Sequence, residues 1–397
     1  MPRLALTAET VLTPLELIEN AVVVIEDQTV QAVGPRSAVE IPAGTRVVDL
    51  GHRIVAPGFV DVHIHGGAGH DLMEATPEAL DALARAVFKH GTTSFVPTTL
   101  SAPQDVLKKS LRGLRSTLAS WKGEQSGPRA EPLGIHLEGP FLSAACRGAH
   151  PREDLQRPSI ALLQQFLDAA GESVKILTLA PELEGAAELQ EYATGKGVRV
   201  AIGHSNATYE EAMRAIEAGA KHAVHLFNAM RAFAHRDPGI LGAVLTDDRV
   251  LAEVIADGVH VAAPALQLLV RSKGVSNTVL VTDAVSATGM SPGRYTLGGM
   301  EIILEDDPLT GLPSCRNREG ALAGSVLTQD RAVRNMVAMA GVSLQDAVRM
   351  ATYNPARLLG LDDRKGCLRP GADADLVVLE PTGALVGAMA RGVANFP

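Results

Sequence analysis

Eight short apolar runs alternate with helical patterns along most of this chain, and that alternation limits the possible fold more than any other feature. The runs cover residues 59–65, 93–98, 133–138, 175–182, 198–204, 222–228, 251–257 and 278–284. Nearly continuous apolar runs are typical of parallel strands buried on both faces. Eight such strands separated by helices predict an α/β fold, a (β/α)8 TIM-like barrel.

The segments between the runs carry signals for helix starts and ends. In the stretch from Thr76 to His90, Thr76 can cap a helix, Pro77 suits its first turn and Gly91 follows its end. A second helix is predicted to begin at Thr208, where Glu211 completes a capping box. These signals predict helices that follow the strands in regular alternation.

The two ends of the chain differ from the middle. They consist of short β-rich runs punctuated by glycine, proline and aspartate, without a long helical pattern. We therefore predict a small β-sandwich domain formed by residues 1–55 and 365–397, and a barrel domain formed by residues 56–364. The less regular stretch of residues 297–321 is expected to be an excursion from the barrel.

Charge and composition narrow the function. A net charge of -9 without a long basic run disfavours nucleic acid and acidic membranes as partners. No window reaches the roughly 18 apolar residues of a membrane span, and the start of the chain lacks a signal-peptide pattern, so we expect a cytoplasmic protein. Three cysteines without a close-spaced pair agree with a reducing compartment.

Histidine and acidic residues stand at the ends of the apolar runs. A strand would direct the imidazoles of His63 and His65, together with Asp61, to one side. Glu138 ends another run, where a buried carboxylate is unfavourable unless it meets a cation. Imidazole and carboxylate groups are ligands of divalent metals such as zinc. The pattern predicts a mononuclear or binuclear hydrolase centre; two hydrogen-bonded structural histidines are the alternative for the HxH pair.

Three further residues end separate runs. His204 and His225 would each fit the core as well as a metal site if taken alone, but with Glu138 they form a ligand set. Asp283 closes the last run, where it can move a proton from water to a leaving amine. A helix cap or a loop carboxylate is the alternative for Asp283. The remaining histidines of these runs, His136 and His222, are expected to be structural or supporting groups.

The motifs around these residues resemble those of the amidohydrolase superfamily. They are PGFVDVHIHG (57–66), HLEGPFL (136–142), RGAH (147–150), GHSNAT (203–208), HLFNAM (225–230), HRDPG (235–239), ADGVH (256–260), VTDA (281–284) and LAGS (322–325). Within that superfamily, the chain is similar to the deacetylases of N-acetylglucosamine 6-phosphate. HLEGPF and HLFNAM are the specific motifs, whereas GADADLVVL (371–379) supports only the wider superfamily.

The resemblance implies roles for particular residues. Glu138, His204 and His225 would hold the catalytic metal, Asp283 would be the general acid and base, and His150 would bind the acetyl carbonyl. Asn228 and Ala229 would meet the sugar phosphate, Arg236 would pair with it, and His260 would lie in the same pocket. The other implied substrate contacts are Ala149, Asp257, Leu322, Ala323 and Gly324. Arginine offers a planar fork that matches phosphate, although an isolated arginine here would otherwise be read as a solvated surface residue.

The number of metal ions is left open by this resemblance. Some of these deacetylases replace the second histidine of HxH and keep one ion, whereas this chain retains His65. A second ion held by His63, His65 and a bridging Glu138 is therefore an alternative to a single ion. The carboxylated lysine that bridges two metals in many relatives is missing, because the fourth run ends in Ala180 and Pro181. Zinc is the expected metal, with iron, cobalt, manganese or nickel as alternatives.

The expected activity is hydrolysis of N-acetyl-D-glucosamine 6-phosphate to D-glucosamine 6-phosphate and acetate, in amino-sugar catabolism and cell-wall recycling. The resemblance also implies a homodimer with the phosphate pocket near the subunit interface. Cys146 lies in the loop before His150 and is either a substrate contact or an ordinary loop thiol. The rival functions are another amidohydrolase acting on a cyclic amide or a nucleobase, and a non-catalytic barrel scaffold.

Overall fold

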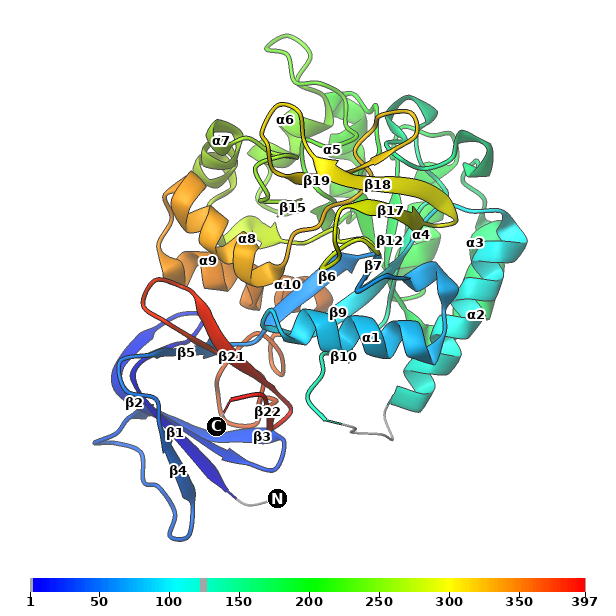
Figure 1. The fold of residues 1–397 in the computed structure, drawn as a ribbon. Coiled ribbons are helices and arrows are strands. Elements are labelled where there is room, and N and C mark those ends of the chain that lie inside the picture. The colour runs from blue at the N-terminus through cyan, green and yellow to red at the C-terminus, as the bar shows by residue number, and fades with distance from the viewer. Residues whose placement is uncertain (1–2, 122–126, 397) are drawn as a thin grey trace.

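The eight predicted runs form the strands of a parallel barrel in a computed structural model that describes residues 3–121 and 127–396 (Figure 1). The barrel strands are β6 (Phe59–Ile64), β9 (Thr92–Thr99), β11 (Ile135–Glu138), β12 (Val174–Leu179), β13 (Arg199–Ile202), β14 (His222–Ala223), β15 (Leu251–Val254) and β16 (Thr278–Leu280). Neighbouring strands pair in parallel, and a bridge between Ile64 and Ala284 brings the end of the series back to β6. The predicted fold class is confirmed.

Helices follow the strands around the barrel (Figure 1). They are α1 (Pro77–Phe88), α2 (Gln104–Trp121), α3 (Ile160–Ala170), α4 (Ala186–Gly195), α5 (Tyr209–Glu217), α6 (Gly239–Thr246), α7 (Ala263–Lys273), α8 (Gln329–Asn335), α9 (Leu344–Ala351) and α10 (Tyr353–Leu359). The predicted caps are present: Thr76 Oγ1 accepts from the N–H of Ala79, and Thr208 and Glu211 form a capping box. Among the described helices, none is long and apolar enough to cross a membrane.

The two ends of the chain meet in one eight-stranded sheet, as the sequence predicted. The sheet contains β1 (Leu4–Leu12), β2 (Leu17–Glu26), β3 (Thr29–Pro35), β4 (Arg46–Asp49), β5 (Ile54–Pro57), β20 (Leu376–Leu379), β21 (Leu385–Ala390) and β22 (Val393–Ala394). It branches at β1, whose first half pairs with β4 and whose second half pairs with β5. The antiparallel pairing of β5 with β20 joins the two ends of the chain.

A buried ion cluster links this terminal sheet to the barrel. Lys365 is almost fully buried, and its Nζ lies 2.6 Å from Glu131 and 2.7 Å from both Asp373 and Asp375. Glu131 belongs to the short strand β10 (Glu131–Pro132), which pairs with β9 of the barrel. Because a buried ammonium group needs charged partners, this cluster favours one arrangement of the two parts.

The excursion after β16 is more regular than the sequence suggested. Its strands β17 (Gly293–Leu297), β18 (Met300–Asp306) and β19 (Pro313–Asn317) form an antiparallel sheet. Figure 1 shows this sheet at the end of the barrel that lies away from the terminal sheet. The available signal was the two-residue turn Gly298-Gly299 between β17 and β18, which apolar periodicity alone does not detect.

Candidate active site

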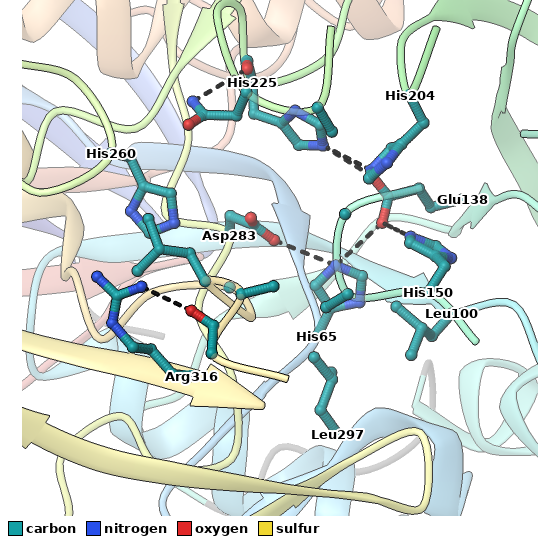
Figure 2. A pocket seen from close by; sticks show the side chains of 18 residues that line it. His65, Leu100, Glu138, His150, His204, His225, His260, Asp283, Leu297 and Arg316 are labelled. Atoms are coloured by element: carbon teal, nitrogen blue, oxygen red, sulfur yellow. Dashed lines mark hydrogen bonds and ion pairs between the residues drawn. The ribbon is translucent and has the colours of Figure 1, made fainter. Parts of the chain in front are cut away.

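Five imidazoles surround the buried carboxylate of Glu138 at the carboxyl end of the barrel strands. Figure 2 shows all of them except His63. Their nearest Nε2 to Glu138 oxygen distances are 3.3 Å for His63, 3.3 Å for His65, 3.4 Å for His150, 3.2 Å for His204 and 3.1 Å for His225. Burial alone would raise the pKa of Glu138, but these neighbours outweigh it and hold that pKa well below its usual range. Glu138 is therefore a carboxylate at the centre of the cluster.

Three of these side chains have the spacing of metal ligands. His204 Nε2 and His225 Nε2 are 3.1 Å apart, and each lies within 3.2 Å of the same Glu138 oxygen. Two nitrogens bound to one tetrahedral zinc at about 2.0–2.1 Å would be about 3.3–3.4 Å apart. The triangle of two nitrogens and one oxygen thus fits a single divalent ion.

The proton positions agree with this fit. His204 Nδ1 lies 3.1 Å from the backbone carbonyl of Cys146, which can only accept, so this nitrogen carries the proton. With the ring proton on Nδ1, a lone pair at His204 Nε2 would face a carboxylate oxygen, a repulsive arrangement that a bound cation relieves. A backbone carbonyl that fixes the tautomer in this way is typical of histidine ligands.

His63, His65 and Glu138 form a second group that could hold a metal ion. His63 Nδ1 lies 3.0 Å from Glu253 Oε2, which leaves Nε2 to face Glu138. Within the described residues, the buried Nε2 of His63 and Nδ1 of His65 have no hydrogen-bond partner. Asp61, which shares their strand face, instead accepts hydrogen bonds from Thr282 and from the His63 N–H.

Glu253 is a supporting residue that the sequence analysis missed. It lies on β15 and is fully buried between His63 and His222, whose Nε2 is 3.2 Å from Glu253 Oε1. It also accepts the backbone N–H of His225 at 3.4 Å. Burial would raise the pKa of Glu253, but the two histidines lower it well below its usual range. Its position within an apolar run was the available signal, since a buried acid needs partners.

Asp283 faces the cluster from the end of the last barrel segment. Its Oδ1 lies 3.1 Å from His65 Nε2 and 3.7 Å from His63 Nε2. Burial would raise the pKa of Asp283, but the hydrogen bond from His65 and the nearby imidazoles lower it to about 2. The side chain is therefore an ionised carboxylate that can accept a proton.

His150 is held as a hydrogen-bond donor toward the cluster. The backbone N–H of Ser101 donates to His150 Nδ1 at 3.2 Å, so this nitrogen carries no proton. Burial lowers the pKa of His150 to about 4, which keeps the ring neutral with its proton on Nε2. A protonated Nε2 can donate to a carbonyl oxygen but cannot ligate a metal.

The backbone at the site is strained at four of the predicted residues. Ala229 has a φ angle of 50°, and His204, His225 and Asp283 have φ angles of 45°, 27° and 50°, all in the left-handed region that favours glycine. The last three follow the ends of their barrel strands, where the chain turns away. Such conformations persist when the surrounding structure over-determines them, and they cluster at functional sites.

A cavity of about 370 Å³ opens over this cluster, a size typical of small-molecule sites. Its lining includes the predicted contacts His65, Glu138, Ala149, His150, His204, His225, Asn228, Ala229, His260, Asp283, Leu322 and Gly324. Asp257 orients His260 through a 2.7 Å contact to Nδ1. Burial would lower the pKa of His260, but Asp257 outweighs it and raises that pKa. Asn228 uses its side-chain N–H groups on carbonyls of its own loop.

Some predicted residues do not line the cavity. Ala323 is buried between two lining residues, and Cys146 lies outside the lining. Arg236 is exposed on the loop of residues 231–237, so this chain by itself does not bring it to the cavity. Arg316, which no motif indicated, does line the cavity.

Comparisons with known proteins show the family to which the chain belongs. A family model described as "Amidohydrolase family" matches residues 54–394. The chain is 39% identical over 347 residues to the N-acetylgalactosamine-6-phosphate deacetylase of Escherichia coli O157:H7, which covers 87% of this chain and 89% of that protein. It is 35% identical over 386 residues to the N-acetylglucosamine-6-phosphate deacetylase of Bacillus subtilis (strain 168). That alignment covers 97% of this chain and 95% of the relative.

A solved structure has the same fold over nearly the whole chain. It is a mutant of N-acetyl-D-glucosamine-6-phosphate deacetylase from Mycobacterium smegmatis in complex with N-acetyl-D-glucosamine-6-phosphate. The TM-score is 0.90 at 37% sequence identity, and the superposition covers 99% of each chain. The likeness thus includes the barrel, the terminal sheet and the excursion after β16.

Proposed function

Because this chain belongs to the amidohydrolase family, we propose that it hydrolyses the acetamide of N-acetyl-D-glucosamine 6-phosphate, releasing acetate and D-glucosamine 6-phosphate. One observation carries the proposal: a single cavity joins the Glu138 cluster, the ionised Asp283 and the donor His150 to His260. The first three suit amide hydrolysis, and His260 suits an anionic group on the same small substrate.

We propose that Glu138, His204 and His225 hold the catalytic divalent metal, with zinc as the expected ion. His63 and His65 are the candidate ligands for a second ion that shares Glu138. A bound ion of this kind polarises a carbonyl and lowers the pKa of a water molecule from 15.7 toward about 7. The carboxylate of Glu253 fixes His63 so that Nε2 is available to such an ion.

The side chains around the ion have complementary proton roles in this proposal. The Nε2–H of His150 donates a hydrogen bond to the acetyl oxygen, which stabilises the negative charge that develops there. Asp283 accepts the proton of the attacking water at its carboxylate and returns it to the sugar nitrogen. The amine then leaves neutral rather than as an anion, a contribution of about 100- to 10,000-fold.

The part of the cavity away from the Glu138 cluster provides the proposed contacts to the rest of the substrate. Ala149, Asn228, Ala229, His260, Leu322 and Gly324 are the proposed contacts, with Asp257 and Ala323 supporting them. Arg236 reaches the phosphate only if a second copy presents its exposed loop, so we propose the homodimer that the resemblance implied. The cytoplasmic location stays a prediction from the sequence.

The substrate test is a comparison of specificity constants for metal-loaded protein. We expect N-acetylglucosamine 6-phosphate to exceed unphosphorylated N-acetylglucosamine by a large factor, and a chelator to abolish turnover of both. N-acetylgalactosamine 6-phosphate belongs in the same series, because a relative with 39% identity is named for it. Preference for a cyclic amide or a nucleobase over all three sugars would contradict the proposal.

A further inference from the structure

Arg316 places a guanidinium group in the wall of the cavity, on an element outside the barrel. The residue lies on β19 of the three-stranded sheet and lines the same cavity as His260 and Asp283. About 25% of its side chain is exposed. The sheet therefore contributes a charged group to the site.

The guanidinium group is held from two sides. Its Nη2 donates to the carboxylate of Asp307 at 2.5 Å, and its Nη1 donates to the Gly320 carbonyl at 2.8 Å. Asp307 is itself buried and also accepts the N–H groups of Leu309 and Thr310. These contacts fix the position of Arg316 before any ligand arrives, which reduces the ordering cost of binding.

Arg316 retains unused donors in this arrangement. A guanidinium group has five N–H donors, and the two contacts to Asp307 and Gly320 occupy two of them. Its Nε is buried and has no hydrogen-bond partner in the described parts of the chain. The remaining N–H groups of Nη1 and Nη2, on a side chain that is about 25% exposed in the cavity wall, are the donors that a ligand would use.

The position of Arg316 in the cavity indicates which part of the substrate it would contact, namely the anionic end. Figure 2 shows Arg316 and His260 together on one side of Asp283, with Glu138 and His204 on the other side. The cavity thus has its metal-ligand cluster at one end and two cationic or donor side chains at the other. An acetamido sugar phosphate has the same polarity, with its amide and its phosphate at different positions.

We propose that Arg316 binds the phosphate of the substrate and is a specificity-determining residue of this site. The inference rests on the proposed deacetylase function, whose substrate carries a phosphate dianion. Arg316 acts from within one chain, in contrast to Arg236 on its exposed loop. Charge-assisted hydrogen bonds from arginine to phosphate are strong enough to decide between a phosphorylated and an unphosphorylated sugar.

The test uses two variants and a matched control. Arg316→Ala removes the guanidinium group, and the double variant Asp307→Asn with Arg316→Ala also removes the buried charge that would be left without its partner. The control is Glu301→Gln with Arg318→Ala, which deletes an ion pair from the same sheet outside the cavity. Thermal unfolding of all three proteins checks that they fold.

We would measure equilibrium binding of glucosamine 6-phosphate and of glucosamine, and specificity constants for the N-acetylated forms of both. For the Arg316 variants, the loss on the phosphorylated ligands should exceed the loss on the unphosphorylated ones by about 10- to 100-fold. The control should bind both as the wild type does.

Two outcomes would overturn the role of Arg316. One is an equal loss on phosphorylated and unphosphorylated ligands in a folded double variant, which would indicate general support of the cavity. The other is a change in the ratio of N-acetylglucosamine 6-phosphate to N-acetylgalactosamine 6-phosphate without loss of phosphate preference, which would assign Arg316 to the sugar hydroxyl groups. If wild-type protein binds glucosamine 6-phosphate but releases no acetate, the proposed function fails while the binding role of Arg316 is still decided.

Discussion

Replacing Glu253 by glutamine should weaken metal binding without a direct change to any proposed ligand. Glu253 accepts from His63 Nδ1 at 3.0 Å and from the His225 N–H at 3.4 Å, and lies 3.2 Å from His222 Nε2. A carboxylate can accept at both oxygens, whereas glutamine offers one acceptor and one N–H donor. If the amide N–H of the new glutamine faces His63 Nδ1, the imidazole must carry its proton on Nε2, the nitrogen that faces Glu138. A protonated Nε2 cannot bind a metal ion.

The expected loss follows from the usual effect of such supporting groups, about 10- to 100-fold in metal affinity. This corresponds to about 1.4–2.8 kcal/mol. The assay is competition for zinc with a chromophoric chelator, with the metal content of each sample determined by elemental analysis. The acid-to-amide change is isosteric, so the variant should still fold.

Glu131→Gln is the matched control for this experiment. Glu131 is also a largely buried acid with a charged partner, but it pairs with Lys365 at the junction with the terminal sheet. Both variants are expected to lower the melting temperature, because each leaves a buried partner without its counter-charge. A folded Glu253→Gln protein with wild-type zinc affinity would refute the supporting role, as would an equal loss of affinity in Glu131→Gln.

Three further variants test the proposed roles. Asp283→Asn should retain fold and metal but lower kcat by about 100-fold or more, because the amide cannot accept the water proton; near-normal acetate release from a metal-loaded sample would remove Asp283 from the mechanism. His65→Asn should reduce bound metal from two ions to one if the site is binuclear; elemental analysis that finds one ion in both proteins, with equal activity, would reject the second ion. Arg236→Ala should lower kcat/KM roughly 30- to 1000-fold for the phosphorylated sugar in the proposed homodimer, and equal losses on both sugars would assign Arg236 to the fold instead.

The sequence was sufficient to predict the barrel and the residues at its strand ends. Buried parallel strands are almost uniformly apolar, so a polar residue at their ends is conspicuous, as Glu138 and Asp283 are. The parity of the HxH pair correctly placed His63 and His65 on one side. These signals are local, and each depends on a few consecutive residues.

The parts that were missed depend on contacts between distant segments. Glu253 contacts His63, which lies 190 residues earlier in the sequence, and the residues around Glu253 do not indicate which residue it pairs with. Arg316 reaches the cavity only because β17, β18 and β19 pair in one particular register. The left-handed backbone at His204 and His225 is likewise imposed by the closed barrel rather than by their own preferences.

The most direct test of the account is product analysis with purified, metal-loaded protein and N-acetylglucosamine 6-phosphate. We predict that acetate and glucosamine 6-phosphate form in equal amounts, that a chelator stops their formation and that added zinc restores it. Glu138→Gln should release neither product, because the variant loses the carboxylate that contacts all four of the proposed histidine ligands, His63, His65, His204 and His225. Unchanged substrate in the presence of a loaded metal site, or equal turnover with and without bound metal, would contradict the account.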